Sequence, residues 1–157
     1  MQIPINDNTF WIAYGASNVG GAILAYTGLK APRLARYLFA ALFAWACWFN
    51  LDTVGETPDV YLDYSYLAYF KFYADFINGF FADHVVAIIT TVAICQGLMS
   101  LGFLVGGRWM TYAAIGAIAF FVSVAPLGIG SAFPSTVLMA VGAYGVLRSG
   151  SASRSAE

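Results

Sequence analysis

Residues 85–105 read VVAIITTVAICQGLMSLGFLV, and this stretch decides the class of fold. It contains no Lys, Arg, Asp, Glu or His. A helix that crosses the hydrocarbon core of a bilayer needs roughly 20 mostly apolar residues, and this stretch supplies them. A soluble domain of this length could not bury several segments of this kind, so we expect an integral membrane protein.

Four further uncharged or nearly uncharged stretches flank this one, and they predict an all-α polytopic bundle of about five spans. Pro126 stops the fourth stretch, and Pro134 can open a helix at its first turn, where its missing N–H is not needed. We expect a single bundle domain over residues 1–148. The other predicted spans are 10–29, 34–51, 109–125 and 134–147.

The first predicted span leaves an alternative open. Asn18 and the Gly20–Gly21 pair weaken a helix at this position, because glycine costs about 1 kcal/mol relative to alanine in a helix. In a four-span form, residues 10–29 would instead lie in the membrane interface or re-enter it.

The overall composition points to the same class of protein and excludes one kind of partner. Hydrophobic residues make up 61% of the chain and charged residues only 10%, whereas soluble proteins carry roughly a quarter charged residues. The formal net charge is −1. Nucleic-acid binding requires a dense cationic patch, so we expect no nucleic-acid partner.

The charged residues are sorted between alternate loops. Short cytoplasmic loops retain Lys and Arg, whereas Asp and Glu influence orientation little. With five spans, the cations after spans one, three and five share one side, and most anions fall between spans two and three. This predicts an external N-terminus, a flexible cytoplasmic tail at 149–157 and a bacterial inner membrane. The residues that set the orientation are Lys30, Arg33, Arg36, Arg108 and Arg148.

Residues 63–81 are rich in aromatic side chains that recur at three- and four-residue spacing. We expect one amphipathic helix that lies at the outer membrane surface or covers the outer ends of the spans. Lys71 and Asp75 are one helical turn apart on its polar face, so they are expected to form an ion pair.

Small residues four positions apart predict close packing between helices. Gly20 and Gly21 each follow a small residue at this spacing in the first span, and Gly102 and Gly106 form such a pair in the third. We therefore expect these four glycines at helix contacts.

A few polar side chains are candidates for ligand binding. Gln96 lies at mid-bilayer depth, where its carboxamide needs a partner, either another helix or a ligand such as a quinone. Tyr73 and Phe76 would flank a ligand held between the aromatic helix and the spans. His84 is the only histidine, so it can supply at most one ligand to a shared cofactor, and we expect no metal site and no catalytic residues.

The region from Arg33 to Gly107 resembles the DoxX-like small membrane proteins. The similar features are an Arg-led helix ending in Asn50, an aromatic loop containing Pro58, the run YADFINGFF at 73–81, and a span closing on Gly–Gly–Arg. The resemblance extends over roughly residues 33–147. It implies a four-helix bundle and a role in quinone-linked redox chemistry or in anchoring oxidoreductase assemblies. Residues 10–29 depart from this pattern.

Three functions are compatible with these features. The first is a non-catalytic membrane subunit that packs against other membrane proteins, favoured by the small-residue faces. The second is a redox helper that binds a quinone, a lipid or another apolar ligand. The third is a small transporter, although the predicted spans carry no ionisable side chain in their interior that would mark an ion path.

Overall fold

The computed structural model describes residues 8–154, with side chains described for residues 8–150. Within that range the chain is entirely helical and contains no strand, which confirms the predicted all-α class. The long helices are α1 (Asn8–Lys30), α2 (Pro32–Glu56), α4 (Val85–Val105), α5 (Gly107–Val124) and α6 (Ser135–Arg154).

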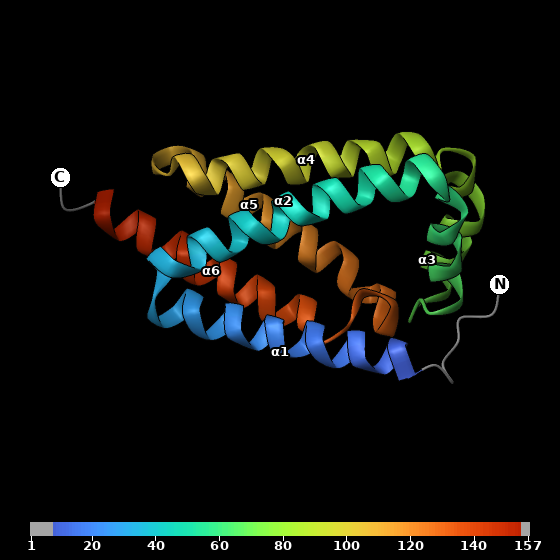
Figure 1. Cartoon of the computed structure of the whole chain (residues 1–157), viewed down its shortest axis with the longest axis horizontal. Coiled ribbons are helices and arrows are strands. Elements are labelled where there is room, and N and C mark those ends of the chain that lie inside the picture. The colour runs from blue at the N-terminus through green and yellow to red at the C-terminus, as the bar shows by residue number, and fades with distance from the viewer. Residues whose placement is uncertain (1–7, 155–157) are drawn as a thin grey trace.

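The long helices lie lengthwise beside one another in a bundle (Figure 1). Helices α1, α4 and α6 run from the end that holds the N-terminus toward the end that holds the C-terminus, and α2 and α5 return. The most extensive contacts are those of α2 with α4, of α1 with α6 and of α5 with α6. The bundle is therefore built from an α2–α4 pair and an α1–α6–α5 group.

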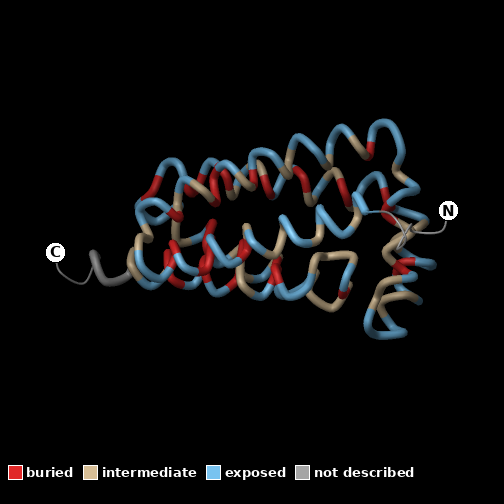
Figure 2. Tube along the Cα trace, turned by 60° about the horizontal axis from the view of Figure 1, so that its bottom comes forward, coloured by how far each residue is buried: buried red, intermediate tan, exposed pale blue. Residues whose placement is uncertain are grey.

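Three helical segments of the described chain are long and apolar enough to cross a membrane: Pro32–Glu56, Val85–Val105 and Gly107–Ser131. Their outward faces carry large apolar side chains, such as Leu98, which is 63% exposed, and Val105, which is 68% exposed. Figure 2 shows most buried positions on the sides of the long helices that face one another, with exposed positions on the outward sides. Such a surface is compatible with lipid contact. Helices α1 and α6 do not meet the same criterion of length and apolarity, so the count of five spans is not confirmed.

A cap of short helices lies across one end of the bundle (Figure 1). It consists of the 3₁₀ helix η1 (Pro58–Tyr66), the helix α3 (Lys71–Phe76) and the π-helical turn η2 (Ile77–Phe81). The prediction of one helix over 63–81 is therefore wrong. The backbone leaves helical geometry between η1 and α3 and again at Gly79, where φ is −108° and ψ is −110°. The predicted ion pair is confirmed, with Lys71 Nζ 2.8 Å from Asp75 Oδ2.

The C-terminal end of the chain also differs from the prediction. Helix α6 continues to Arg154, so it includes residues 149–154 of the predicted flexible tail, whose flexibility stays a prediction, and residues 155–157 lie outside the described range. Alanine, serine and arginine in this stretch are compatible with a helix, and no proline interrupts it. The short 3₁₀ helix η3 (Ala125–Ser131) precedes α6 and contains Gly128 at a φ of 66°.

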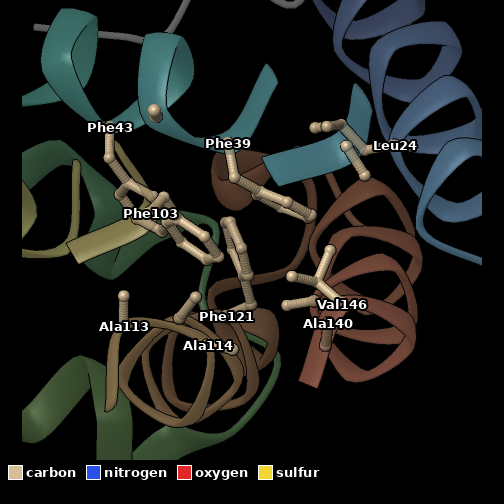
Figure 3. Packing of buried hydrophobic residues seen from close by; sticks show 13 residues of the cluster. Leu24, Phe39, Phe43, Phe103, Ala113, Ala114, Phe121, Ala140 and Val146 are labelled. Atoms are coloured by element: carbon tan, nitrogen blue, oxygen red, sulfur yellow. The ribbon is translucent and has the colours of Figure 1, made fainter. Parts of the chain in front are cut away.

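The main core is a stack of phenylalanine rings between α2, α4 and α5 (Figure 3). The Phe39 and Phe103 ring centroids are 5.4 Å apart, and those of Phe43 and Phe121 are 5.5 Å apart. Small residues surround the rings and let the helices approach. These are Ala35, Ala40, Ala113, Ala114, Ala117 and Ala143.

Helices α1 and α6 form a parallel pair whose backbones touch through glycine. A Cβ at Gly28 would overlap the backbone of Gly142, and one at Gly145 would overlap the backbone of Gly28. Gly21 packs against Ser135, whose Oγ donates to the Ser17 carbonyl oxygen at 2.7 Å. Contact this close strengthens dispersion and permits weak Cα–H···O bonds.

The four glycines predicted at helix contacts have three different environments. Gly21 lies in the α1–α6 contact, and a Cβ at Gly102 would approach Ala113 Cβ to 2.8 Å in the α4–α5 hairpin. Gly20 has no neighbour within 4 Å of its Cβ position, so it packs against no other described helix. Gly106 ends α4 with a φ of 83°, so it serves the turn into α5 and not a helix face.

The sorting of charge along the sequence corresponds to two ends of the bundle. The α1–α2 turn, the α4–α5 turn and the C-terminal part of α6 meet at one end (Figure 1). This end holds Lys30, Arg33, Arg36, Arg108 and Arg148. Arg36 Nη2 also donates to the Leu104 carbonyl oxygen at 3.1 Å, which satisfies a free carbonyl at the end of α4. Lys71, in the cap, is the exception to the sorting.

Candidate functional site

A cavity of about 800 Å³ lies between the α2–α4 pair and the α5–α6 group, next to the cap. Its size falls within the range of roughly 300–1,000 Å³ that is usual for small-molecule sites. Most of its wall is apolar and aromatic. The polar side chains in the wall are those of Asn50, Tyr61, Tyr64, Tyr73, Gln96, Ser123, Ser131 and Thr136.

Residues of the cap form part of the cavity wall, among them Phe72, Tyr73 and Phe76. Two hydrogen bonds fasten the cap to the end of α5 and to η3. Tyr73 Oη donates to the Ser123 carbonyl oxygen at 2.9 Å, and the Tyr69 amide donates to the Pro126 carbonyl oxygen at 2.9 Å. Tyr73 therefore serves both as part of the cavity wall and as an anchor of the cap.

A chain of three polar side chains crosses from the cap to mid-helix depth. Tyr61 Oη donates to Asn50 Oδ1 at 2.7 Å, and Asn50 Nδ2 donates to Gln96 Oε1 at 2.8 Å. Gln96 is only 2% exposed, and all three residues line the cavity. The prediction that the Gln96 carboxamide needs a partner is confirmed. Its bond to Asn50 joins α4 to α2, as does the bond from Ser100 Oγ to the Ala40 carbonyl oxygen.

The two cap tyrosines in the cavity wall are neutral hydrogen-bonding groups. Burial raises the pKa of Tyr64 above its ordinary value. Burial also raises the pKa of Tyr61, while a hydrogen bond with Thr53 lowers it and the neighbouring Tyr64 raises it. Because the ordinary tyrosine pKa is already about 10, both phenols are protonated near neutral pH, and Tyr61 is a donor to Asn50.

Thr136, at the start of α6, presents a hydroxyl with unmet hydrogen-bonding capacity. It is 7% exposed and lines the cavity, yet its Oγ1 has no partner among the described residues. A buried hydroxyl without a partner costs about 1–3 kcal/mol.

The cavity wall contains no Asp, Glu, Lys, Arg or His among its lining residues. Part of the wall reaches the molecular surface, because Trp45 is 56% exposed and Phe72 is 64% exposed. These rings mark an opening beside α2 and α3. An uncharged molecule suits such a site better than an ion does.

Three of the four side chains predicted to bind a ligand come together in this cavity: Gln96, Tyr73 and Phe76. His84 does not line it. Its ring stacks on Phe80 with centroids 4.4 Å apart, and its Nδ1 lies 2.9 Å from the Phe80 carbonyl oxygen. His84 therefore supports the junction between the cap and α4.

Sequence reasoning missed Asn50, Tyr61 and Thr136 as members of the site. Asn50 could have been found from the sequence, because it is a carboxamide near the end of a long apolar stretch, as Gln96 is a carboxamide in the middle of another. Two carboxamides in apolar helices are natural partners for each other. Tyr61 and Thr136 carried no comparable signal, since each is an ordinary residue in its local sequence.

Comparisons with protein families, with curated proteins and with solved structures found no match for this chain. Within residues 8–154, no group of three or more His, Cys, Asp or Glu side chains is arranged to hold a metal ion. The resemblance to DoxX-like proteins stays a prediction.

Proposed function

We propose that this chain is a membrane-embedded binding protein for an uncharged apolar molecule, such as a lipid or a quinone, which it holds in the cavity beneath the cap. The observation that carries the proposal is the cavity itself. It combines about 800 Å³ of mostly apolar space with a short row of hydrogen-bonding side chains. Ligand sites commonly have this combination of an apolar wall and a few placed polar groups.

The opening of the cavity gives an apolar molecule a way in. Trp45 and Phe72 line the cavity and are 56% and 64% exposed, so the cavity is continuous with the outer surface of the bundle. An apolar occupant would gain dispersion contacts with the mostly apolar wall.

The proposal includes five membrane crossings, with α1 and α6 as the first and the last. Helix α1 has 23 residues and α6 has 20, and at 1.5 Å per residue each is about as long as the hydrocarbon core is thick. Two polar side chains of α1 are satisfied within the helix. Thr27 Oγ1 donates to the Ile23 carbonyl oxygen, and Asn18 Nδ2 donates to the Tyr14 carbonyl oxygen. This pattern supports an α1 that tolerates lipid despite its modest apolarity.

Reporter fusions test the five crossings and their direction. Because the cationic end is expected in the cytoplasm of a bacterial cell, a reporter after Arg154 should be cytoplasmic and one before Asn8 should be external. Paired fusions that are active only in the cytoplasm or only outside it provide the measurement. Two termini on the same side of the inner membrane would contradict five crossings.

A cavity-filling substitution tests the binding function. Val92 lines the cavity from α4, so Val92→Phe should occupy the space of a ligand without adding a polar group. The probe is a saturated long-chain hydrocarbon that carries an alkyl diazirine, applied to the protein in vesicles. In the native protein, photolabelling should saturate at peptides of the cavity wall, and in Val92→Phe it should fall by roughly tenfold, the equivalent of about 1.4 kcal/mol.

The matched control is Val86→Phe on the same helix, where the side chain is 52% exposed on the outer surface. Its cavity labelling should equal that of the native protein. Probe that is dissolved in the bulk bilayer labels outward-facing residues without saturation. Saturable labelling of the cavity can therefore be distinguished from this background. Equal saturable labelling in Val92→Phe and in the native protein would show that the cavity is not the binding site.

The surface of the cap favours a second candidate, a non-catalytic subunit that docks on another membrane protein. Tyr66 is 78% exposed and Tyr69 is 81% exposed, and several exposed phenylalanines lie close to them in the cap. Exposed aromatic side chains are enriched at protein interfaces. Photocrosslinking from position 69 in intact membranes tests this candidate, which requires a discrete crosslinked protein of higher mass.

A further inference from the structure

We propose that the cavity selects a molecule whose polar end is an uncharged carbonyl group, with Gln96 Nε2 as the donor to the carbonyl oxygen and the Thr136 hydroxyl as a second polar contact. The proposal rests on the binding function proposed above and adds the chemical class of the ligand. Three observations support it: the direction of the hydrogen bonds, an unmet hydroxyl and the absence of charge in the wall.

The hydrogen bonds from Tyr61 to Asn50 and from Asn50 to Gln96 leave the Gln96 amide nitrogen as the donor at the end of the row. Tyr61 Oη donates to Asn50 Oδ1, and Asn50 Nδ2 donates to Gln96 Oε1, so the carbonyl oxygen of Gln96 already accepts a hydrogen bond. No residue of the described chain accepts a hydrogen bond from Gln96 Nε2. A carboxamide nitrogen carries two N–H donors and no acceptor. The group that complements it is therefore an acceptor, and carbonyl oxygens are the usual acceptors in apolar molecules.

Thr136 provides an independent indication of a polar group on the ligand. Its hydroxyl is buried in the cavity wall on α6, on the opposite side from the α2–α4 pair, and no described residue bonds to it. A hydrogen bond from the hydroxyl to a polar atom of an occupant would remove the cost of burying it unpaired. The hydroxyl can donate to an acceptor such as a carbonyl oxygen.

The wall excludes a charged head group. No cationic side chain is present among the lining residues to pair with a carboxylate or a phosphate, and no anionic one to pair with an ammonium group. Moving an unpaired ion from water into such a site is far more costly than moving a carbonyl group. Fatty acids and phospholipid head groups should therefore bind less well than neutral carbonyl compounds.

Competition against the diazirine hydrocarbon probe tests this inference. The competitors share one chain length and differ only in the end group: an alkane, a methyl ketone and an ionised carboxylate, each at matched concentration within the vesicle membrane. In the native protein the ketone should compete roughly threefold to tenfold better than the alkane, the net effect of one hydrogen bond. The carboxylate should compete no better than the alkane.

Two variants show which side chains produce the preference for the ketone over the alkane. Gln96→Leu removes the donor, and Thr136→Val keeps the shape of the side chain while it removes the hydroxyl. Each variant should lower the ketone preference, Gln96→Leu by more than Thr136→Val, with alkane competition unchanged. Gln96→Leu leaves Asn50 without its partner, so Thr136→Val provides the test that does not depend on the α2–α4 hydrogen bond.

The possible results distinguish a failure of the binding function from a failure of the carbonyl preference. Failure of the hydrocarbon probe to label the cavity would contradict the binding function itself. Saturable labelling with equal competition by ketone and alkane, or a preference for the carboxylate, would keep the binding function and overturn the carbonyl assignment. Two further competitors, a monoacylglycerol and a benzoquinone with an alkyl chain, identify the natural source of the carbonyl, and stronger competition by either one supports the proposal.

Discussion

Replacing Gly28 with leucine is expected to disrupt the bundle. A side chain at this position meets the backbone of Gly142, which cannot rotate away as a side chain can. Overpacking of a core typically costs about 1–3 kcal/mol, and a clash with backbone belongs at or above the upper end of that range. The α1–α6 pair would have to separate along its length. Thermal stability in detergent and monodispersity by size-exclusion chromatography measure the effect.

Gly20→Leu is the control for this substitution. Gly20 lies on the same helix and has no neighbour within 4 Å of its Cβ position. Both substitutions improve helix propensity by up to about 1 kcal/mol, so a difference between them reports packing and not propensity. Native-like stability of Gly28→Leu would show that α1 and α6 do not pack as described.

The second large effect is expected from Phe103→Ala. This ring has no exposed surface, and it stacks on Phe39 and Phe43 at centroid distances of 5.4 and 6.1 Å. Loss of a buried phenylalanine costs about 3–5 kcal/mol in soluble cores. In lipid the transfer contribution is small, because the unfolded helix is also in an apolar phase, while the lost dispersion contacts and the void remain. We therefore expect the lower end, about 3 kcal/mol.

Leu101→Ala on the same helix provides the comparison. Leu101 is 57% exposed on the outer face of α4, where lipid can fill the space that the side chain leaves. Unfolding in a detergent mixture of increasing strength should distinguish the two variants by a clear shift in midpoint. Equal midpoints for Phe103→Ala and Leu101→Ala would contradict the assignment of the phenylalanine stack as the core.

The long helices could be predicted closely from the sequence, because length and apolarity decide them. The predicted span 85–105 matches α4, and the predicted ends of the other long helices differ mostly by a few residues. The largest difference is at the end of α6, where serine and arginine resemble a mobile tail but still permit a helix. Composition alone could not decide between these states.

The cap could be predicted only in outline. Aromatic spacing indicated a helical segment, and the Lys71–Asp75 pair is in place. The break between η1 and α3 is accompanied by a tertiary contact, the hydrogen bond that the Tyr69 amide donates to the Pro126 carbonyl oxygen, and the second break falls at Gly79. Such contacts override a local helical pattern, and a single sequence does not display them.

The candidate site was predictable where a residue conflicts with its surroundings and not elsewhere. Gln96 stood out because a carboxamide in an apolar helix needs a partner. Asn50, which satisfies it, lies 46 residues away, and their pairing depends on the crossing of α2 and α4. The α1–α6 contact could not be predicted for the same reason, which is that the sequence does not show which helices are neighbours. Gly28 and Gly142 become significant only once α1 and α6 are known to pack together.

Native mass spectrometry of the protein extracted in mild detergent is the direct test of the binding function, because it detects an occupant of the cavity without assuming what it is. We expect a discrete mass above that of the bare chain, corresponding to one retained uncharged molecule. Val92→Phe should lose this mass and Val86→Phe should retain it. Detection of only the bare chain in the native protein and in both variants would contradict the proposed binding function.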